Sequence, residues 1–344
     1  MAVPTMDTLS LGKSAPRCVS ITTKIILHSI LNPLLKIQWF AFLFSFIDAI
    51  LAVYFRTICK LSSCTVVMDD EQTSMHFWAP KRRDPRKPNL LMIHGYGGDS
   101  KWQFMYQAGP LSQSFNLYAP DLVFFGKSYS TRPDRTTAFQ AKCVAQGMEQ
   151  LGVGRYSVYS ISYGGYVAYS MAEMNPESVE KMVIVSSGIA LTEEQKAEHL
   201  GKLEKDVVDL LVPQKAEDLR LLLNLSIHKY DRFKGYPDIF LQGFIDALGQ
   251  RNRKEKKELI EHLMAKKPDD NLSIIPQETL LVWGDSDKVF PLVFGQQLQR
   301  HLGSKAKLKI LKDTGHASNM ESAHLLNDCM KEFLLSKSYF SKEN

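Results

Sequence analysis

The sequence predicts an α/β protein in which a doubly wound, mostly parallel sheet carries an inserted helical cap. Apolar runs of strand length recur along the chain, and most are continuous, as expected for strands that helices cover on both faces. Helical patterns such as residues 139–151 separate these runs, and this alternation is typical of an open α/β sheet. The predicted strands are residues 73–79, 90–93, 115–119, 156–161, 182–186, 279–283 and 308–311.

One long interval interrupts the alternation. Between residues 189 and 276 no strand pattern occurs, and amphipathic helical patterns repeat instead. We expect these helices to form a cap over one end of the sheet. They are predicted at residues 206–211, 216–225, 239–248 and 256–265. The predicted organisation is an N-terminal hydrophobic segment (1–60), a short Cys- and Ser-containing link, a first core part (65–188), the cap (189–276) and a second core part (277–338).

Composition places the chain among ordinary globular proteins. Its 344 residues are 44% hydrophobic and 23% charged, which permits a sizeable core. The net charge of +5 is mild, and basic residues do not interleave with aromatic ones, so we expect no nucleic-acid partner. The two densest basic runs, residues 81–87 and 251–257, are interpreted as solvated surface. The oligomeric state is left open.

The sequence lacks the usual patterns of metal and cofactor sites. Its five cysteines are odd in number and have no CxxC spacing, which argues against a disulfide framework and a structural zinc site. None of the nine histidines falls in an HExxH or HxxxH pair, and GxxxxGK[ST] is absent. We therefore expect neither a metal nor a cofactor.

The N-terminal segment contains a helix-length apolar run at residues 37–55. These nineteen residues contain one charge, Asp48, and as a helix they would measure roughly 28 Å, close to the thickness of a bilayer core. Small and polar residues share one narrow face, and large apolar residues fill the rest. We expect this helix to lie in a membrane interface, or to pack its small face on a neighbour while its broad face meets lipid. The small face comprises Gln38, Ala41, Ser45, Asp48, Ala49 and Ala52.

One other interpretation of this segment stays open, a helix buried against the body of the protein. We accordingly expect one of two locations for the protein. It is either membrane-associated, for example on the cytosolic face of the endoplasmic reticulum, or cytoplasmic. Basic residues flank both ends of the apolar run, so its orientation is undecided.

The stretch SISYGG places Ser162 where a predicted strand meets a predicted helix. A side chain thrust out of so sharp a turn needs small residues two places before and two places after it, because strand and helix nearly collide there. Ser160 and Gly164 occupy these places, with Ser160 in place of the more common glycine. The pattern indicates a nucleophilic serine; the alternative is a tight turn without a chemical role.

A nucleophilic serine needs a base and an acid that orients the base. Downstream, the predicted strand 279–283 leads into a loop with Asp285 and Asp287, and the strand 308–311 leads into a loop with His316. The order Ser, Asp, His at successive strand ends fits this chemistry. We predict that Ser162, Asp287 and His316 act together, with Asp285 capping its loop.

The stretch LLMIHGYGGDS follows another strand and offers backbone N–H groups near the serine. Its glycines let the chain approach closely, so the amides of Tyr96 and Tyr163 are predicted to form an oxyanion hole. His94 is expected to be a buried hydrogen-bonding post for the loop rather than a catalytic group.

The motifs HGYGG, PDLVFFGKS, SISYGG, GDSDKVFP and TGH resemble those of the α/β-hydrolase fold superfamily, specifically its capped plant-type serine hydrolases. The resemblance spans residues 75–335 and extends more distantly to bacterial carbon–carbon bond hydrolases. It implies Ser162 as nucleophile, His316 as base, Asp287 as orienting acid and Asp121 as a structural anchor. An aspartate nucleophile, as in epoxide hydrolases, is disfavoured because Ser162 stands at that position.

The expected activity is hydrolysis of an ester or thioester of a small lipophilic substrate through an acyl-enzyme. Three alternatives on the same fold stay open: an acyltransferase, a carbon–carbon bond hydrolase and a non-catalytic small-molecule receptor. Fold alone does not choose among them.

Overall fold

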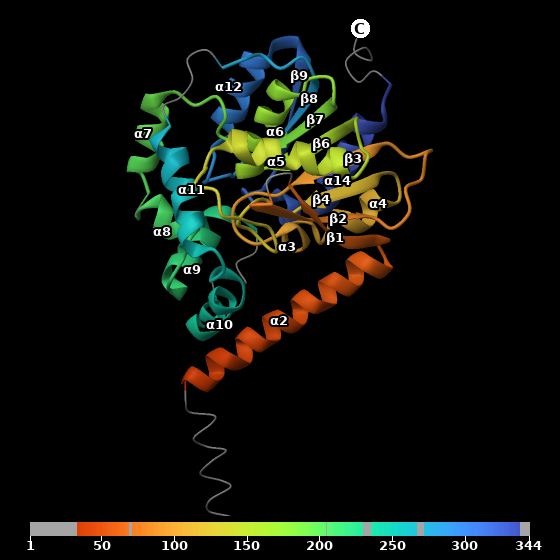
Figure 1. The fold of residues 1–344 in the computed structure, drawn as a ribbon. Coiled ribbons are helices and arrows are strands. Elements are labelled where there is room, and N and C mark those ends of the chain that lie inside the picture. Colours follow the sequence, from red (N-terminus) through yellow and green to blue (C-terminus); the bar gives the residue numbers. More distant parts are fainter. Residues whose placement is uncertain (1–32, 69–70, 204, 230–234, 267–271, 338–344) are drawn as a thin grey trace, which may run out of the picture.

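The computed structural model describes residues 33–68, 71–203, 205–229, 235–266 and 272–337, with the backbone alone for 33–38. Within these residues nine strands form one sheet in the order β1-β2-β4-β3-β6-β7-β8-β9, and β5 pairs with β2 outside this order. Figure 1 shows helices on both faces of the sheet. The strands are β1 (Leu61–Val67), β2 (Thr73–Pro80), β3 (Asn89–Ile93), β4 (Asn116–Pro120), β5 (Tyr129–Ser130), β6 (Tyr156–Ile161), β7 (Val179–Val185), β8 (Glu278–Gly284) and β9 (Ala306–Leu311).

The sheet is mostly parallel, as predicted. The strands from β4 to β9 along the sheet pair in parallel, whereas β1 and β2 pair antiparallel, as do β2 and β4. All seven predicted strands are present. The doubly wound α/β fold is therefore confirmed.

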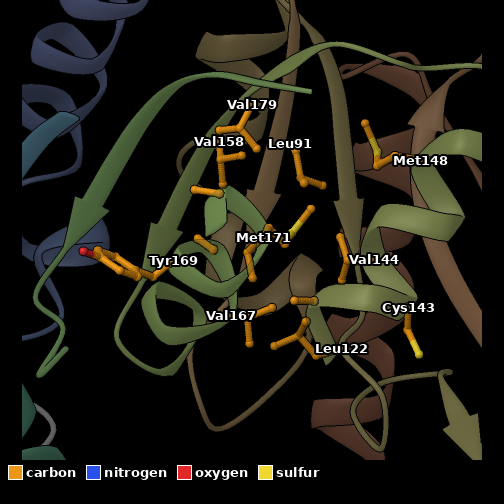
Figure 2. Packing of buried hydrophobic residues seen from close by; sticks show 14 of the residues in the cluster. Leu91, Leu122, Cys143, Val144, Met148, Val158, Val167, Tyr169, Met171 and Val179 are labelled. Carbon is orange, nitrogen blue, oxygen red and sulfur yellow. The ribbon is translucent and has the colours of Figure 1, made fainter. Parts of the chain in front are cut away.

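Alternate residues of each buried strand enter two different cores. In β3, Leu91 and Ile93 join one apolar cluster, and Leu90 and Met92 join the other. Figure 2 shows part of the first cluster, in which side chains of α5 and α6 meet the sheet. This burial on both faces explains why the strands read as continuous apolar runs. The helices of the two layers are α3 (Ser100–Phe104), α4 (Ala108–Ser112), α5 (Thr137–Gln150), α6 (Tyr163–Met174), α12 (Leu292–Leu302), α13 (Ser318–Glu321) and α14 (Ala323–Leu335), with a short 3₁₀ turn, η3 (Gly303–Lys305).

The first strand was not predicted. The segment expected to be a link forms β1, which pairs with β2 along its whole length, from Leu61 opposite Pro80 to Val67 opposite Ser74. β1 is an edge strand, and only Leu61 and Val66 in it are buried. Its serines and cysteine therefore give no clear alternation, and the pairing with β2 decides its conformation.

Within the described residues of the predicted cap, all regular elements are helices. Figure 1 shows them grouped beside the sheet, between β7 and β8 in the chain. Helical structure appears at all four predicted places, and α7 is an addition. After Phe244 the third predicted helix changes to a π-helix. The elements are α7 (Glu193–Gly201), α8 (Val207–Leu211), α9 (Ala216–Ser226), α10 (Asp238–Phe244), η2 (Ile245–Gly249) and α11 (Arg253–Ala265).

One interpretation of the cap is wrong. The basic run 251–257 was expected to be solvated, but Lys256 is only 8% exposed. Its ammonium group lies 5.4 Å from the centre of the Phe125 ring, and its carbonyl accepts a hydrogen bond from the hydroxyl of Tyr96. Lys256 faces inward because α11 turns this part of its surface onto the core.

The predicted apolar helix exists as α2 (Pro33–Thr57), and it packs along the body. Phe44 contacts Phe240 and Phe244 in the cap region, and Phe55 contacts Trp78 in β2, with ring centres 4.9–5.3 Å apart. Gly243 lets the two backbones approach closely, because a Cβ there would lie 2.4 Å from the Cβ of Phe40. The helix is therefore attached to both the cap and the core.

The face that α2 buries is only partly the predicted small face. Ala52 packs against the core and Asp48 faces Trp102, whereas Ser45 and Ala49 are exposed. The aromatic side chains of Phe44 and Phe55 fill part of the remaining inner surface. Gln38 lies outside the residues whose side chains the structure describes.

We predict that Phe55→Ala lowers the free energy of unfolding by about 3–5 kcal/mol, because Phe55 is fully buried and its removal leaves a cavity. Phe46→Ala on the exposed side of the same helix serves as the control, with an expected change within about 0.5 kcal/mol. Denaturant unfolding measures both. Equal effects would mean that α2 does not belong to the core.

Candidate active site

Ser162 stands at the sharp turn between β6 and α6. Its φ of 54° and ψ of −122° lie in a region that residues other than glycine rarely adopt. Gly164 makes the turn sterically possible, because a Cβ there would lie 2.5 Å from the carbonyl oxygens of Ile93 and His94. Ser160 fits in place of the usual glycine, since it is buried and its hydroxyl donates to the carbonyl of Val183 at 3.2 Å.

Three side chains that are distant in the sequence form one hydrogen-bonded chain. Nε2 of His316 lies 3.0 Å from Oγ of Ser162, and Nδ1 of His316 lies 3.0 Å from Oδ2 of Asp287. They follow β6, β8 and β9, whose carboxyl ends lie on the same edge of the sheet. The structure thus brings together the three residues that the sequence singled out.

The environment of Asp287 fixes its orientation. Oδ1 accepts hydrogen bonds from the amides of Val289 and Phe290, both at 2.8 Å, which leaves Oδ2 to the imidazole of His316. The network therefore assigns the proton of His316 to Nδ1, and Nε2 is left to accept the proton of the Ser162 hydroxyl. Asp285 instead accepts from the amide of Thr314 at 3.3 Å, in the loop-capping position predicted for it.

The loop after β3 lies directly against Ser162. A Cβ on Gly95 would lie 3.0 Å from the Cβ of Ser162, tighter than most real Cβ contacts, so glycine favours this approach. The rings of Tyr96 and Tyr163 meet edge to face at 5.9 Å, and Tyr163 is the first residue of α6, where helix N–H groups have no intrahelical partner. Burial raises the pKa of both phenols, so these groups stay protonated at neutral pH. The loop thus offers this site backbone amides rather than acids or bases.

Two predicted anchors hold that loop. His94 is fully buried, its Nδ1 donates to the carbonyl of Gly95 at 2.7 Å and its Nε2 accepts from the amide of Leu122 at 2.9 Å. Burial lowers the pKa of His94, which suits this neutral role. Asp121 accepts from the amide and hydroxyl of Ser100 and from the amide of Lys127. Both residues are structural, as expected.

The sequence analysis missed Glu321. Its carboxylate is 7% exposed and accepts three backbone amides: Gly315 at 2.7 Å, His228 at 2.8 Å and Lys229 at 2.5 Å. Glu321 therefore ties the loop that carries His316 to the end of α9 in the predicted cap. The available signal was an acidic residue five positions after His316, but spacing alone does not reveal amides 93 residues away in the chain.

A cavity of about 130 Å³ lies between α6 and the helices α7 and α11. Its lining is largely apolar, with Tyr166, Leu200 and Leu263 among the residues, although Glu173 and Lys196 also reach it. Phe290 connects this cavity to the hydrogen-bonded chain, because it lines the cavity and its ring lies 5.6 Å from that of His316. Phe290 thus lies between the cavity and His316, and neither His316 nor Ser162 is among the residues that line the cavity.

The family assignment agrees with this geometry. The sequence profile of the α/β hydrolase fold matches residues 88–323. This range covers the sheet from β3 onward and includes Ser162, Asp287 and His316. The protein belongs to the α/β hydrolase fold family.

Curated relatives differ in the activity that their names describe. The chain is 28% identical over 253 residues to a dihydrolipoyllysine-residue acetyltransferase component of an acetoin cleaving system from Cupriavidus necator, covering 71% of this chain and 63% of that protein. The chain therefore spans less than two thirds of that relative. It is also 27% identical over 256 residues to a 2-hydroxy-6-oxo-6-phenylhexa-2,4-dienoate hydrolase from Comamonas testosteroni, covering 71% and 87%.

Solved structures share the fold at low identity. A membrane phospholipase A described as a bacterial virulence factor superposes with a TM-score of 0.70 at 21% identity, covering 92% of this chain and 96% of that one. A putative lipase from Acinetobacter baumannii superposes with a TM-score of 0.71 at 24% identity, covering 84% and 95%. At these identities the likeness establishes the fold alone.

We predict that Glu321→Gln accelerates amide hydrogen exchange at Gly315 and His228 and lowers the free energy of unfolding by about 1–3 kcal/mol. The reason is that the new amide NH₂ faces a backbone donor and leaves buried groups unpaired. Asp328→Asn on the exposed side of α14 is the matched control. Unchanged exchange at both amides would refute the anchoring role.

Lys256 predicts a pH dependence of stability. Burial, with the nearby charges of Arg253 and Arg251, lowers its pKa from 10.5 to about 8. Between these values the unfolded chain binds more protons, so stability rises with pH across that window. Lys256→Met should stabilise the protein at pH 7 by on the order of 2 kcal/mol and remove the rise. Denaturant unfolding from pH 6 to 11 measures this, with the exposed Lys254→Met as the control.

Proposed function

We propose that the protein is a serine hydrolase that cleaves an ester or thioester of a lipophilic substrate through an acyl-enzyme. The observation that carries the proposal is the alignment of Ser162, His316 and Asp287 at 3.0 Å contacts, with Ser162 held in a strained turn. A strained turn and two such contacts are costly to maintain without a chemical use.

The proposed reaction has two halves. Oγ of Ser162 attacks the acyl carbon while Nε2 of His316 takes the hydroxyl proton, and the imidazolium is stabilised by Asp287. His316 then gives this proton to the leaving alcohol or thiol. In the second half His316 deprotonates a water, the water attacks the acyl-enzyme, and the proton returns to Ser162 as the acid leaves.

The amides of Tyr96 and Tyr163 are proposed to bind the oxyanion. Two observations support this proposal: Gly95, the neighbour of Tyr96, approaches Ser162 closely, and Tyr163 is the first residue of α6, where N–H groups have no intrahelical partner. Losing one such donor typically costs about 3–4 kcal/mol of transition-state stabilisation.

A lipophilic acyl group suits the cavity beside Phe290. The cavity is bordered by Leu200, Leu263 and Met264 from the cap, which favour an alkyl or aryl group. The names of the two superposed structures, a phospholipase and a putative lipase, support a lipid-like ester. A series of p-nitrophenyl esters of graded chain length tests this preference.

Carbon–carbon bond hydrolysis is the second candidate. It is supported by the relative from Comamonas testosteroni, of which the match covers 87%. A vinylogous diketone substrate separates it from ester hydrolysis. Acyl transfer, suggested by the name of the Cupriavidus necator relative, is separated by offering competing alcohols and sorting the products.

We also propose that the protein associates with a membrane through α2. Residues Trp39–Thr57 are long and apolar enough to span a bilayer, and only 11% of this window is buried. The inner face of α2 is attached to the cap and the core along its length, which favours a helix lying in the plane of the interface. We propose that this membrane surface faces the cytosol, for example at the endoplasmic reticulum. Cell fractionation tests this location.

Ser162→Ala should abolish labelling by a fluorophosphonate probe and lower ester turnover by roughly 10⁴-fold or more, because Ser162 carries the hydroxyl that is bonded to His316. Ser160→Ala, two residues earlier in β6, is the matched control, and it should keep both. Full labelling of the Ser162→Ala protein would end the assignment.

A further inference from the structure

An apolar stripe runs along the outer face of α2. It consists of large side chains at spacings of three and four residues, on the face opposite the one that packs on the body. Soluble monomers rarely leave so continuous an apolar surface exposed. The stripe comprises Trp39, Phe42, Leu43, Phe46, Ile50 and Val53, with exposed fractions from 40% to 72%.

The stripe is free of charge because the structure turns Asp48 inward. The carboxylate of Asp48 accepts from Nε1 of Trp102 at 2.9 Å and lies 3.1 Å from Nζ of Lys101, which is itself buried. Asp48 is the only residue between Trp39 and Phe55 that is charged at neutral pH. The charge of Asp48 is thus paired on the side of the protein body, by a lysine that also contacts Asp99 at 2.7 Å.

A basic groove begins where α2 ends. It has a volume of about 850 Å³ and lies between the end of α2, the loop after β2 and the residues around α4. Its charged lining contains one carboxylate, Asp84, whose oxygens accept from Arg86. The cations that line it are Lys60, Lys81, Arg82, Arg83, Arg86 and Lys87.

The formal charge of the groove can be compared with the net charge of the whole chain. Six cations and one carboxylate give it a formal charge of +5, which equals the net charge of the protein, so all other charged residues balance. The basic run 81–87 is largely exposed, in agreement with its interpretation as solvated surface, and it also lines this positively charged groove.

The stripe and the groove form one continuous surface. Ile58 follows the last residue of α2, is 63% exposed and lines the groove, so apolar and cationic side chains meet there. Self-association through this surface would bring two groups of +5 charge together. A single-stranded nucleic acid would use exposed aromatic rings in the groove, but the aromatic residue in its lining, Phe115, is buried.

We propose that this surface docks the protein on an anionic phospholipid bilayer. The stripe enters the layer of headgroups and the first part of the acyl chains, with α2 parallel to the membrane, and the groove binds the phosphate-bearing headgroups beside it. The proposal extends the membrane association proposed above by naming the lipid and the second contact region. It does not depend on the chemistry at Ser162.

The docking also brings the membrane close to the predicted cap. Phe40 and Phe44 on the inner face of α2 contact Phe240 in α10, so the stripe and the cap are separated by one helix. A lipophilic molecule dissolved in the bilayer would therefore be held near α10.

The test is co-sedimentation of the full chain with vesicles of phosphatidylcholine alone and with about 30% phosphatidylserine. Lys81→Gln combined with Arg82→Gln should lower partitioning onto the anionic vesicles roughly 10- to 30-fold and leave partitioning onto neutral vesicles unchanged. Both side chains are exposed, so folding should be unaffected. The matched control, Lys309→Gln with Lys312→Gln, removes two exposed charges at the β9 edge of the sheet and should bind as the wild type does.

A second variant separates the two parts of the surface. Phe42→Ser with Phe46→Ser should weaken binding to both kinds of vesicle, because the stripe contributes wherever there is a bilayer. Equal binding of the wild type to neutral and anionic vesicles, an equal loss in the control, or preferential binding of a labelled oligonucleotide would each overturn the proposal. Ser162→Ala should bind vesicles normally, so a failure of the proposed enzyme and a failure of docking remain distinguishable.

Discussion

The structure depends on one steric constraint, the close approach of the end of β3 to the turn between β6 and α6 at Ser162. The carbonyl oxygens of Ile93 and His94 come so close that glycine is required at position 164, and a Cβ at Gly95 would lie 3.0 Å from the Cβ of Ser162. The turn forces Ser162 to a positive φ and directs its side chain out of the sheet edge. The positions of His316 and Asp287 follow from this point, because their strands lie in parallel beside β6 and end at the same edge.

The loops that carry the polar residues are held by side chains of other elements. Asp287 is fixed by two amides of its own loop, His94 and Asp121 fix the glycine-containing loop, and Glu321 fixes the loop of His316. Since Glu321 also binds amides after α9, a displacement of that cap segment would reach His316 through one carboxylate. The position of that segment and the geometry of the imidazole are therefore physically linked.

In the N-terminal helix α2, Asp48 faces the protein body and large apolar side chains face outward. Asp48 is paired on the inner side by Lys101 and Trp102, and this leaves an uncharged outer stripe. The positive charge is collected instead in the groove after the helix. An apolar stripe beside a cationic groove is the distribution that an anionic bilayer surface complements, because acyl chains and headgroup phosphates lie a few ångströms apart along its normal.

The sequence by itself determined the features that depend on local periodicity and order along the chain. These are the buried strands, the helices of the predicted cap, the turn at Ser162 and the succession of Ser162, Asp287 and His316. Tertiary structure alone decided the pairing of β1, the burial of Lys256, the inner face of α2 and the anchoring by Glu321. Each of these depends on a partner far away in the chain, and a contact at long range leaves no period in the sequence. The +5 groove is of the same kind, because only folding places Lys60 beside residues 81–87.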